Sequence, residues 1–559
     1  MKDTTEHIEE NFHDNDIDID ASSEKGPVVE EEVPLMEQLK AARGVIKYMA
    51  IIFAASIGIG IDSMVFSLML GLESFRKEYG YWNEASQGWV IKAVYQSGWN
   101  GGSQGTQIVG SLFAGQFSDM IGRRYTLCVA AIIAIVAAVI EVTAKNAAVL
   151  VAGKCIMGLG TGVLVTVVPP YLSELSPPKL RGYAAIGINF SICFGQFLAA
   201  ITVMGCSRSY PGIDDNRAYK VSLSVQFILV SVFLLVSPVL PESPALLVQR
   251  GKIDKARDVL HKIYGENTGY DLDGHLDLLV AQVQKETIEK EHSKNISYLE
   301  VFKGIQFWRL LIVTAVLTGQ QWVGFTFVLP YINYFFENAG ISSSNEKTVG
   351  VMTIAVGGNM LSYVLLEKIP RRKLFVYGVM FLGICNLLTG SMSLASSSAS
   401  GYVLVVFICL WSFVYQFAIG SNAYAIMVEI PSSRLVPKTV AVASNVNSLI
   451  GFGLGYLIPF LYNPDEVNMG LKIMYVWFGT SVVLFVFVLF FLPESKNRTA
   501  LEMDQMFEEH VNPLYFDKVQ FTVDGDLIQS TAVKGYTSGY FAAFRSKKAW
   551  LTKTDETDV

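Results

Sequence analysis

Long apolar runs recur along the whole chain, and short polar segments containing most of the charged residues separate them. Each run has about the 20 residues that a helix needs to cross a bilayer. Because lipid offers the backbone no hydrogen-bond partner, such runs predict helices. The pattern therefore predicts an all-α membrane protein with twelve transmembrane helices. The predicted spans are 47–70, 91–114, 125–144, 148–171, 183–204, 221–240, 308–336, 348–366, 374–397, 401–427, 438–461 and 471–492.

The polar segments divide the chain into five parts. Residues 1–46 contain 13 acidic and 4 basic residues and are expected to form a disordered, solvated tail. Six-helix bundles are expected over 47–240 and 308–492. The charged linker between them, 241–307, is expected to form short amphipathic helices on the cytoplasmic face, and 493–559 to form a polar cytoplasmic tail.

The second bundle repeats motifs of the first. GQFSDMIGRR is echoed by LLEKIPRRK, SELSPPKLRG by VEIPSSRLVPK, and LPESP by LPES. Each echo lies about 250 residues after its original, and three independent echoes predict two parallel, pseudo-symmetric halves with the site at their interface.

The basic residues predict the orientation. They concentrate in alternate loops, which the positive-inside rule places in the cytoplasm together with both termini. The residues in question are Lys40, Arg43, Lys47, Arg123, Arg124, Lys179, Arg181, Arg371, Arg372, Lys373, Arg434 and Lys438.

Composition excludes several classes of function. The mean hydropathy is +0.38, and the net charge of −7 comes from the acidic tail. No basic patch indicates nucleic acid. The six cysteines lie in or beside apolar runs without metal-ligand spacing, so they are expected to be packing residues. No phosphate-binding loop, metal cluster or nucleophile–base pattern indicates an enzyme or a cofactor.

One carboxylate, Asp62, interrupts the apolar run from Ile46 to Leu72. An ionised Asp facing lipid costs at least a few kcal/mol, so Asp62 is expected to face a polar interior with a partner. A protonated Asp that hydrogen-bonds a neighbouring helix is the alternative. We predict that Asp62 takes up and releases a proton during the working cycle.

Lys154 is the expected partner. Counting residues puts Asp62 about 20 Å from the cytoplasmic face of a ~30 Å core, and Lys154 about 9 Å below the outer face. These similar depths allow a buried ion pair, and a proton on Asp62 would free Lys154. Alternatively, Lys154 snorkels to the outer interface. Glu141, near the outer end of its helix, is expected to be an interfacial residue only.

Six motifs resemble the sugar porter family of the major facilitator superfamily: GQFSDMIGRR, PPYLSELSPPKLRG, PESPALL, GQQWVG, EIPSSR and LPESKNRT. Within that family, EIPSSRLVPKT, YFFENAGIS and PESPALLVQRGKIDKAR look most like the fungal α-glucoside (maltose-type) proton symporters. The resemblance implies the major facilitator fold and transport by alternating access. Lys154 departs from it, because relatives that carry protons with monosaccharides usually have Arg there and maltose-type members usually lack a base.

Sugar recognition needs amide and hydroxyl groups, which both donate and accept hydrogen bonds, together with aromatic faces. The resemblance implies a sugar site made of Gln196, Gln320, Gln321, Thr326, Tyr331, Gln416, Tyr424 and Asn445. Thr326 replaces a family Asn and Tyr424 the usual Trp, which favours a pocket rebuilt for a different or larger sugar. For any single amide, the alternative is a hydrogen bond that ties helices together.

Opposite charges at the cytoplasmic helix ends can pair across helices. A network that forms in one conformation and breaks in the other would bias the rocking of the two halves. The resemblance implies that it closes the inner side when the carrier faces out, and membrane anchoring is the alternative. The predicted gate comprises Asp119, Arg123, Arg124, Glu174, Arg181, Glu242, Glu367, Arg371, Arg372, Glu429, Arg434 and Glu494.

These observations predict a monomeric, multi-pass plasma-membrane carrier that imports a sugar by proton symport, an α-glucoside such as maltose being favoured. Its partners would be the sugar, the proton and the bilayer. The alternatives are a proton-independent hexose facilitator, a non-transporting sugar sensor on the same scaffold, and a carrier for another polyol or cyclic acid.

Overall fold

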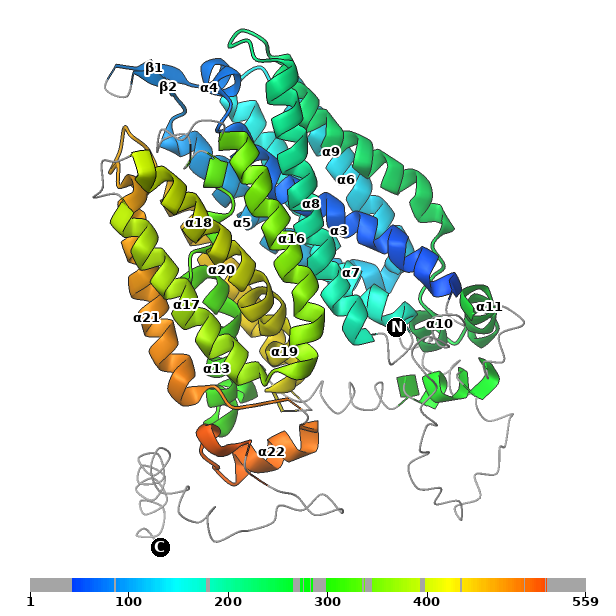
Figure 1. Cartoon of the computed structure of the whole chain (residues 1–559). Helices are drawn as coiled ribbons and strands as arrows, with labels where there is room; N and C mark the ends of the chain where they lie inside the picture. The colour runs from blue at the N-terminus through cyan, green and yellow to red at the C-terminus, as the bar shows by residue number, and fades with distance from the viewer. Residues whose placement is uncertain are drawn as a thin grey trace, which may run out of the picture.

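Figure 1 shows the computed structural model of the chain. The structure describes residues 43–517 and 519, except for gaps at 85–86, 177–180, 265–271, 275, 282, 285–297, 334–335, 337–343, 393–397, 433–434 and 497. Of the predicted gate, Arg434 and the side chain of Arg181 lie outside the described residues, as do most of the two predicted tails.

Long helices make up most of the described chain, as predicted. The first six are α3 (Arg43–Met69), α5 (Ala93–Ile121), α6 (Arg123–Thr143), α7 (Ala147–Leu175), α8 (Arg181–Ser209) and α9 (Arg217–Val236). The later ones are α13 (Gly304–Trp322), α16 (Ser344–Lys368), α17 (Arg371–Ser391), α18 (Ser398–Tyr415), α20 (Val436–Tyr462) and α21 (Ile473–Phe491).

Eleven helical segments of the described chain are long and apolar enough to cross a membrane. The remaining predicted span, 91–114, corresponds to α5, which is 29 residues long but is not among these eleven segments. It carries Gln96, Asn100, Gln104 and Gln107, which lower its hydropathy, and it packs between α7 and α20. The twelfth crossing therefore stays a prediction.

The helices pack in two groups (Figure 1). Helices α3 and α5–α9 pack on one another, and helices from α13 to α21 do the same. The groups meet along two pairs of helices, α5 with α20 and α8 with α16. The seam between the groups is thus lined by helices from both parts of the chain.

Two predicted spans are not continuous α-helices. The span over 308–336 stops at Trp322 and resumes as α14 (Phe325–Val328). Gly324 between them has a φ of 94°, which favours glycine. The span over 401–427 contains a π-helical turn, η5 (Gln416–Gly420), before α19 (Ser421–Glu429). Such turns occur frequently at functional sites.

Small elements distinguish the two ends of the bundle (Figure 1). One end, called the hairpin end, carries α4 (Glu73–Tyr79) and the antiparallel strands β1 (Tyr81–Asn83) and β2 (Gly88–Val90). The sequence analysis did not predict this hairpin. The opposite end, called the motif end, carries α10 (Pro244–Gln249), α11 (Ile253–Tyr264) and α22 (Ala500–Glu508). Short 3-10 turns are η2 (Ser237–Val239), η3 (Tyr298–Phe302), η6 (Gly470–Lys472) and η7 (Pro513–Tyr515).

Helix α22 is attached to the second group of helices. Arg309 of α13 is only 1% exposed and pairs with Asp504 of α22, and its guanidinium lies 4.3 Å from the centre of the Phe507 ring. Thr499 and Glu502 form a capping box at the start of the helix. The sequence analysis assigned no chemistry to this segment.

Candidate functional site

The structure brings Asp62 and Lys154 together. Asp62 lies in α3 and is 6% exposed, and Lys154 lies in α7 and is 5% exposed. The Lys154 ammonium contacts Asp62 Oδ1 and also donates to the Asp62 main-chain carbonyl at 3.0 Å. Lys154 is therefore buried beside Asp62 and does not snorkel to an interface.

Two neutral side chains complete the surroundings of the Asp62 carboxylate. Thr161 Oγ1 donates to Oδ2 at 3.3 Å, and Gln226 Nε2 donates to Oδ1 at 3.3 Å. A cavity of about 20 Å³ lies against Asp62, lined by α3, α6, α7 and α9. That volume is enough for about one water molecule. The sequence analysis missed Thr161 and Gln226.

The expectation that Glu141 is an interfacial residue is wrong. Glu141, near the hairpin end of α6, is 1% exposed, and neither carboxylate oxygen has a hydrogen-bond partner among the described residues. It packs on Gly153 of α7, where an added Cβ would lie 2.9 Å from Glu141 Cγ. The missing side chain of Gly153 therefore makes the room that Glu141 occupies beside α7.

The side chains of Gln320, Tyr415 and Tyr424 lie together in the second group of helices. Tyr415 Oη donates to Gln320 Oε1 at 2.8 Å, and Gln320 also lies within hydrogen-bonding reach of Tyr424. The Tyr415 ring stacks on Trp411 and on Phe325. Half of the Tyr424 surface is exposed although it lies beside the buried Gln320. Tyr415 was not among the predicted site residues.

Gln321 of α13 lies close to the seam between the groups, where α5 packs on α20. Its Oε1 accepts a hydrogen bond from Thr326 Oγ1. An added Cβ on Gly451 of α20 would lie 2.6 Å from Gln104 Oε1 and 3.4 Å from Gln321 Nε2. Amides from the two groups thus converge on Gly451, and Gln104 is a further candidate that the sequence analysis missed.

The remaining predicted amides are dispersed. Gln416 of η5 accepts from Asn359 Nδ2 at 3.3 Å. Gln196 of α8 donates to Ser63 at 3.3 Å, next to Asp62 in the chain. Asn445 of α20 is exposed. Gln196 and Asn445 lie on other helices than Gln320, whereas Gln416 directly follows Tyr415 in the chain.

At the hairpin end the two groups of helices are bridged repeatedly. Tyr331 is buried and accepts a hydrogen bond from Asn100 of α5 at 2.6 Å, so in this conformation it joins the two groups. Tyr81 and Asn83 of β1 both donate to Asp465. The other described bridges are Asn463 to the Ile91 carbonyl, Ser97 to the Tyr456 carbonyl, Asn333 to the Leu68 carbonyl, Asn345 to Ser207 and Arg208 to Glu346.

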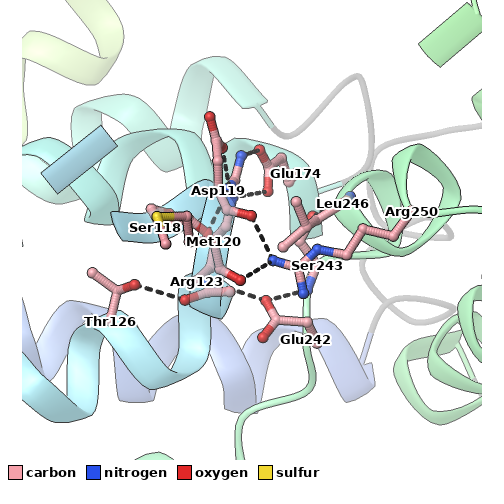
Figure 2. Close-up of polar contacts among 11 residues, drawn as sticks. Ser118, Asp119, Met120, Arg123, Thr126, Glu174, Glu242, Ser243, Leu246 and Arg250 are labelled. Carbon is pink, nitrogen blue, oxygen red and sulfur yellow. Dashed lines mark hydrogen bonds and ion pairs between the residues drawn. The ribbon is translucent and has the colours of Figure 1, made fainter. Parts of the chain in front are cut away.

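At the motif end, Arg123 is the centre of an ion-pair cluster (Figure 2). Its side chain pairs with Asp119 at 2.6 Å and with Glu174 at 3.2 Å, and its main-chain N–H donates to Glu242 Oε1 at 2.8 Å. Gly122 before it has a φ of 102°, and an added Cβ would lie 2.3 Å from Glu242 Oε2. Only glycine fits this turn.

Arg371 has corresponding contacts in the second group. Its side chain pairs with Glu429 at 2.7 Å, and its main-chain N–H donates to Glu494 Oε1 at 2.9 Å. The main-chain N–H of Arg372 donates to Glu494 Oε2 at 3.2 Å. In both clusters a glutamate accepts from the first N–H groups of a helix, where the helix dipole favours an anion.

Both clusters link helices within one group. At the motif end, a hydrogen bond from Tyr183 of α8 to Glu367 of α16 joins the two groups. Arg124 has no ion pair among the described residues, and its guanidinium lies 5.4 Å from the Tyr125 ring. Arg250, which was not predicted, donates to the last carbonyls of α5, those of Asp119 and Met120 (Figure 2).

A helical bundle with paired glutamate–arginine clusters at one end is what the motifs led us to expect. The family described as "Sugar (and other) transporter" matches residues 48–507. The chain belongs to this sugar transporter family.

Two relatives agree with this assignment. MFS transporter fmqE of Aspergillus fumigatus is 26% identical over 533 residues, which cover 93% of this chain and 98% of that protein. The General alpha-glucoside permease of Saccharomyces cerevisiae is 28% identical over 462 residues, which cover 81% and 73%.

Solved structures show the fold of this sugar transporter. The inward open conformation of the xylose transporter XylE from E. coli matches with a TM-score of 0.66, covering 83% of this chain and 99% of that chain at 20% identity. XylE bound to 6-bromo-6-deoxy-D-glucose matches with a TM-score of 0.65 at 21% identity. The major facilitator fold is therefore confirmed, and these relatives and structural neighbours are transporters rather than enzymes.

Proposed function

We propose that this sugar transporter imports an α-glucoside such as maltose together with a proton. The observation that carries the proposal is the buried Asp62–Lys154 ion pair. A buried ion pair is expensive to form, and breaking it by removing one charge costs about 3–5 kcal/mol. An ionisable pair at this depth in a membrane helix is most readily explained by a role in ion movement.

Coupling follows from what protonation does to the pair. A proton on the Asp62 carboxylate removes the negative charge that holds Lys154. Protonated and ionised forms therefore favour different arrangements of α3 and α7, the two helices that carry the pair. Because a ligand shifts a conformational equilibrium only through differential binding, the proton drives the change if one conformation binds it more tightly. The water-sized cavity at Asp62 offers a proton an entry point.

The proposed sugar site lies at the seam between the groups, next to α13 and α20, where the candidate side chains are uncharged. Gln320, Gln321 and Gln104 offer amides that donate and accept, and Tyr424 offers an accessible aromatic face. In this proposal Thr326, Gln196, Gln416 and Asn445 contribute at the margins. The relative named General alpha-glucoside permease supports the choice of sugar.

The proposed cycle is alternating access. In this conformation the groups are bridged mainly at the hairpin end, so cargo would leave at the motif end, which the positive-inside rule predicts to face the cytoplasm. The Arg123 and Arg371 clusters would keep each group rigid, and further contacts between the groups, added to the one from Tyr183 to Glu367, would close the motif end when the groups rock.

An uptake panel tests the proposal. The chain is expressed in yeast cells that lack their own sugar carriers, and uptake of radiolabelled maltose, trehalose, sucrose and glucose is measured at two external pH values. We expect maltose uptake that is faster at the lower pH and alkalinisation of the medium when maltose is added.

Each rival function gives a different result. Uptake that is independent of pH and leaves the medium unchanged indicates a facilitator. Surface expression without uptake of any sugar indicates a sensor. Sugar uptake that unlabelled polyols or cyclic acids suppress more strongly than sugars do indicates a carrier for those compounds. Any of these results contradicts α-glucoside–proton symport.

A further inference from the structure

A second carboxyl group is buried near the Asp62–Lys154 pair. Glu141 is 1% exposed, and neither of its oxygens has a hydrogen-bond partner in the part of the chain that the structure describes. Isolated carboxylates are almost never buried in the charged form, because removing a charged group from water costs far more free energy than removing a neutral carboxyl group. Glu141 therefore carries a proton in this conformation.

The charged groups that act on Glu141 are Lys154 and Asp62. Lys154 directly follows Gly153, on which Glu141 packs. Helix α9 also packs on α6, and its charged residues lie at the hairpin end, where Arg217 pairs with Asp215 and Lys220 is exposed. In α5 the charged residue is Asp119, at the motif end.

Tyrosines pack at the end of α6 that carries Glu141. Tyr79 of α4 donates its hydroxyl to the carbonyl of Ala144, three residues after Glu141, and its ring packs edge-on against Tyr219 of α9. Burial raises the pKa of Tyr79, so it remains a neutral hydroxyl.

Glu141 lies level with the start of the ion pair. An added Cβ on Gly153, the residue before Lys154, would lie 2.9 Å from Glu141 Cγ. Lys154 in turn contacts Asp62. One lysine therefore connects the surroundings of the two carboxyl groups.

We propose that Glu141 is a second proton-binding site that exchanges a proton with Asp62, with Lys154 as their shared counter-ion. The inference rests on the proposed proton coupling. In the step, the Glu141 O–H bond breaks and an O–H bond forms on Asp62. The Lys154 ammonium keeps its three protons and moves from Asp62 to Glu141. One proton and one positive charge are shared by two carboxylates throughout, so the buried net charge stays zero.

Infrared spectroscopy tests the protonation without any substrate. The purified wild type, Glu141→Gln, Asp62→Asn and the control Glu73→Gln, an exposed acid of α4, are compared at neutral pH in the carbonyl-stretching region of protonated carboxyl groups. We expect one band to disappear in Glu141→Gln and to persist in Glu73→Gln. It should also disappear in Asp62→Asn, because Lys154 then pairs with an ionised Glu141.

Two results would overturn the proposal. The first is a Glu141→Gln spectrum identical to that of the wild type. The second is a Glu141 band that persists at full strength in Asp62→Asn, which would mean that the two carboxyls do not share Lys154. If Glu141→Gln does not fold, the Asp62→Asn spectrum decides alone.

Transport in proteoliposomes separates this inference from the proposed function. With maltose and an inward pH gradient, we expect Glu141→Gln to lower accumulation at least tenfold while maltose exchange without a gradient persists. If the wild type accumulates maltose and Glu141→Gln does so equally, the proton exchange is refuted and symport stands. If the wild type does not accumulate maltose, symport fails, and the infrared comparison still decides whether Glu141 binds a proton.

Discussion

The two groups of helices are alike at the motif end and different in the middle. At the motif end, Arg123 and Arg371 each pair with a glutamate of a neighbouring helix and donate a main-chain N–H to a second glutamate. Away from that end, the interior of the first group contains Asp62, Lys154 and Glu141, whereas that of the second offers buried amides and tyrosines.

This difference indicates a division of labour. Charged groups that can hold a proton lie in the first group, and groups suited to a neutral, hydroxyl-rich ligand lie mainly in the second. The repeated clusters at the motif end serve both groups equally, because each group must stay rigid while the pair rocks. Substitutions in each group of helices test this division.

The largest effect is expected from Asp62→Asn. Removing the titratable group should abolish uphill sugar accumulation and leave exchange or downhill flux. The measurement is the ratio of internal to external labelled sugar under an inward pH gradient. Gln320→Ala, which alters a buried polar group of the second group, is the control and should still accumulate sugar. Full accumulation by Asp62→Asn would contradict a role for the charged groups of the first group in proton coupling.

Lys154→Met should be the most destabilising single change. It leaves Asp62 without its cation, at a cost of about 3–5 kcal/mol. The double variant Asp62→Asn/Lys154→Met should recover most of that loss, because neither charge remains. Thermal unfolding in detergent measures both. Equal stability of the single and double variants would show that the two charges are not energetically coupled.

Arg123→Ala and Arg371→Ala test the similarity at the motif end. Each loses charge-assisted hydrogen bonds of about 1.5–3 kcal/mol, so we expect transport to slow by about tenfold or more in both. Sugar binding, measured by equilibrium titration, should be retained. Loss of binding at normal turnover, or an effect confined to one variant, would contradict an equivalent role for the clusters.

The smallest effect is expected from Gln320→Ala. A neutral hydrogen bond contributes about 0.5–1.5 kcal/mol, so the half-saturating sugar concentration should rise by roughly two- to tenfold. Tyr424→Phe, which keeps the aromatic face, should change it less than Tyr424→Ala does. An unchanged half-saturating concentration in Gln320→Ala would show that the sugar does not bind at Gln320.

Much of this organisation is predictable from the sequence. Eleven spans follow from the length and hydropathy of the runs, and the family follows from the motifs. Asp62 and Lys154 could be placed at one depth because residue counts give depth along a helix. Both were conspicuous as lone charges in apolar runs.

The rest depends on three-dimensional neighbours. Glu141 lies near the end of an apolar run, so the count along the helix suggested an interface. Its burial depends on Gly153 of another helix, which leaves room for the Glu141 side chain. Gln104 and Tyr415 gave no signal either, because their role depends on which helix faces them. The break at Gly324 is visible in the sequence only as one glycine among many.

The attachment of α22 has a practical consequence for handling the protein. The Asp504 carboxylate neutralises the buried Arg309, which also donates to the Met503 carbonyl at 3.2 Å, and Phe507 covers its guanidinium. Truncating the chain before residue 500 would uncover that arginine at the base of α13. Affinity tags and fluorescent fusions are therefore best joined downstream of Phe516, where the ring already packs against Phe507 and the anchor is complete.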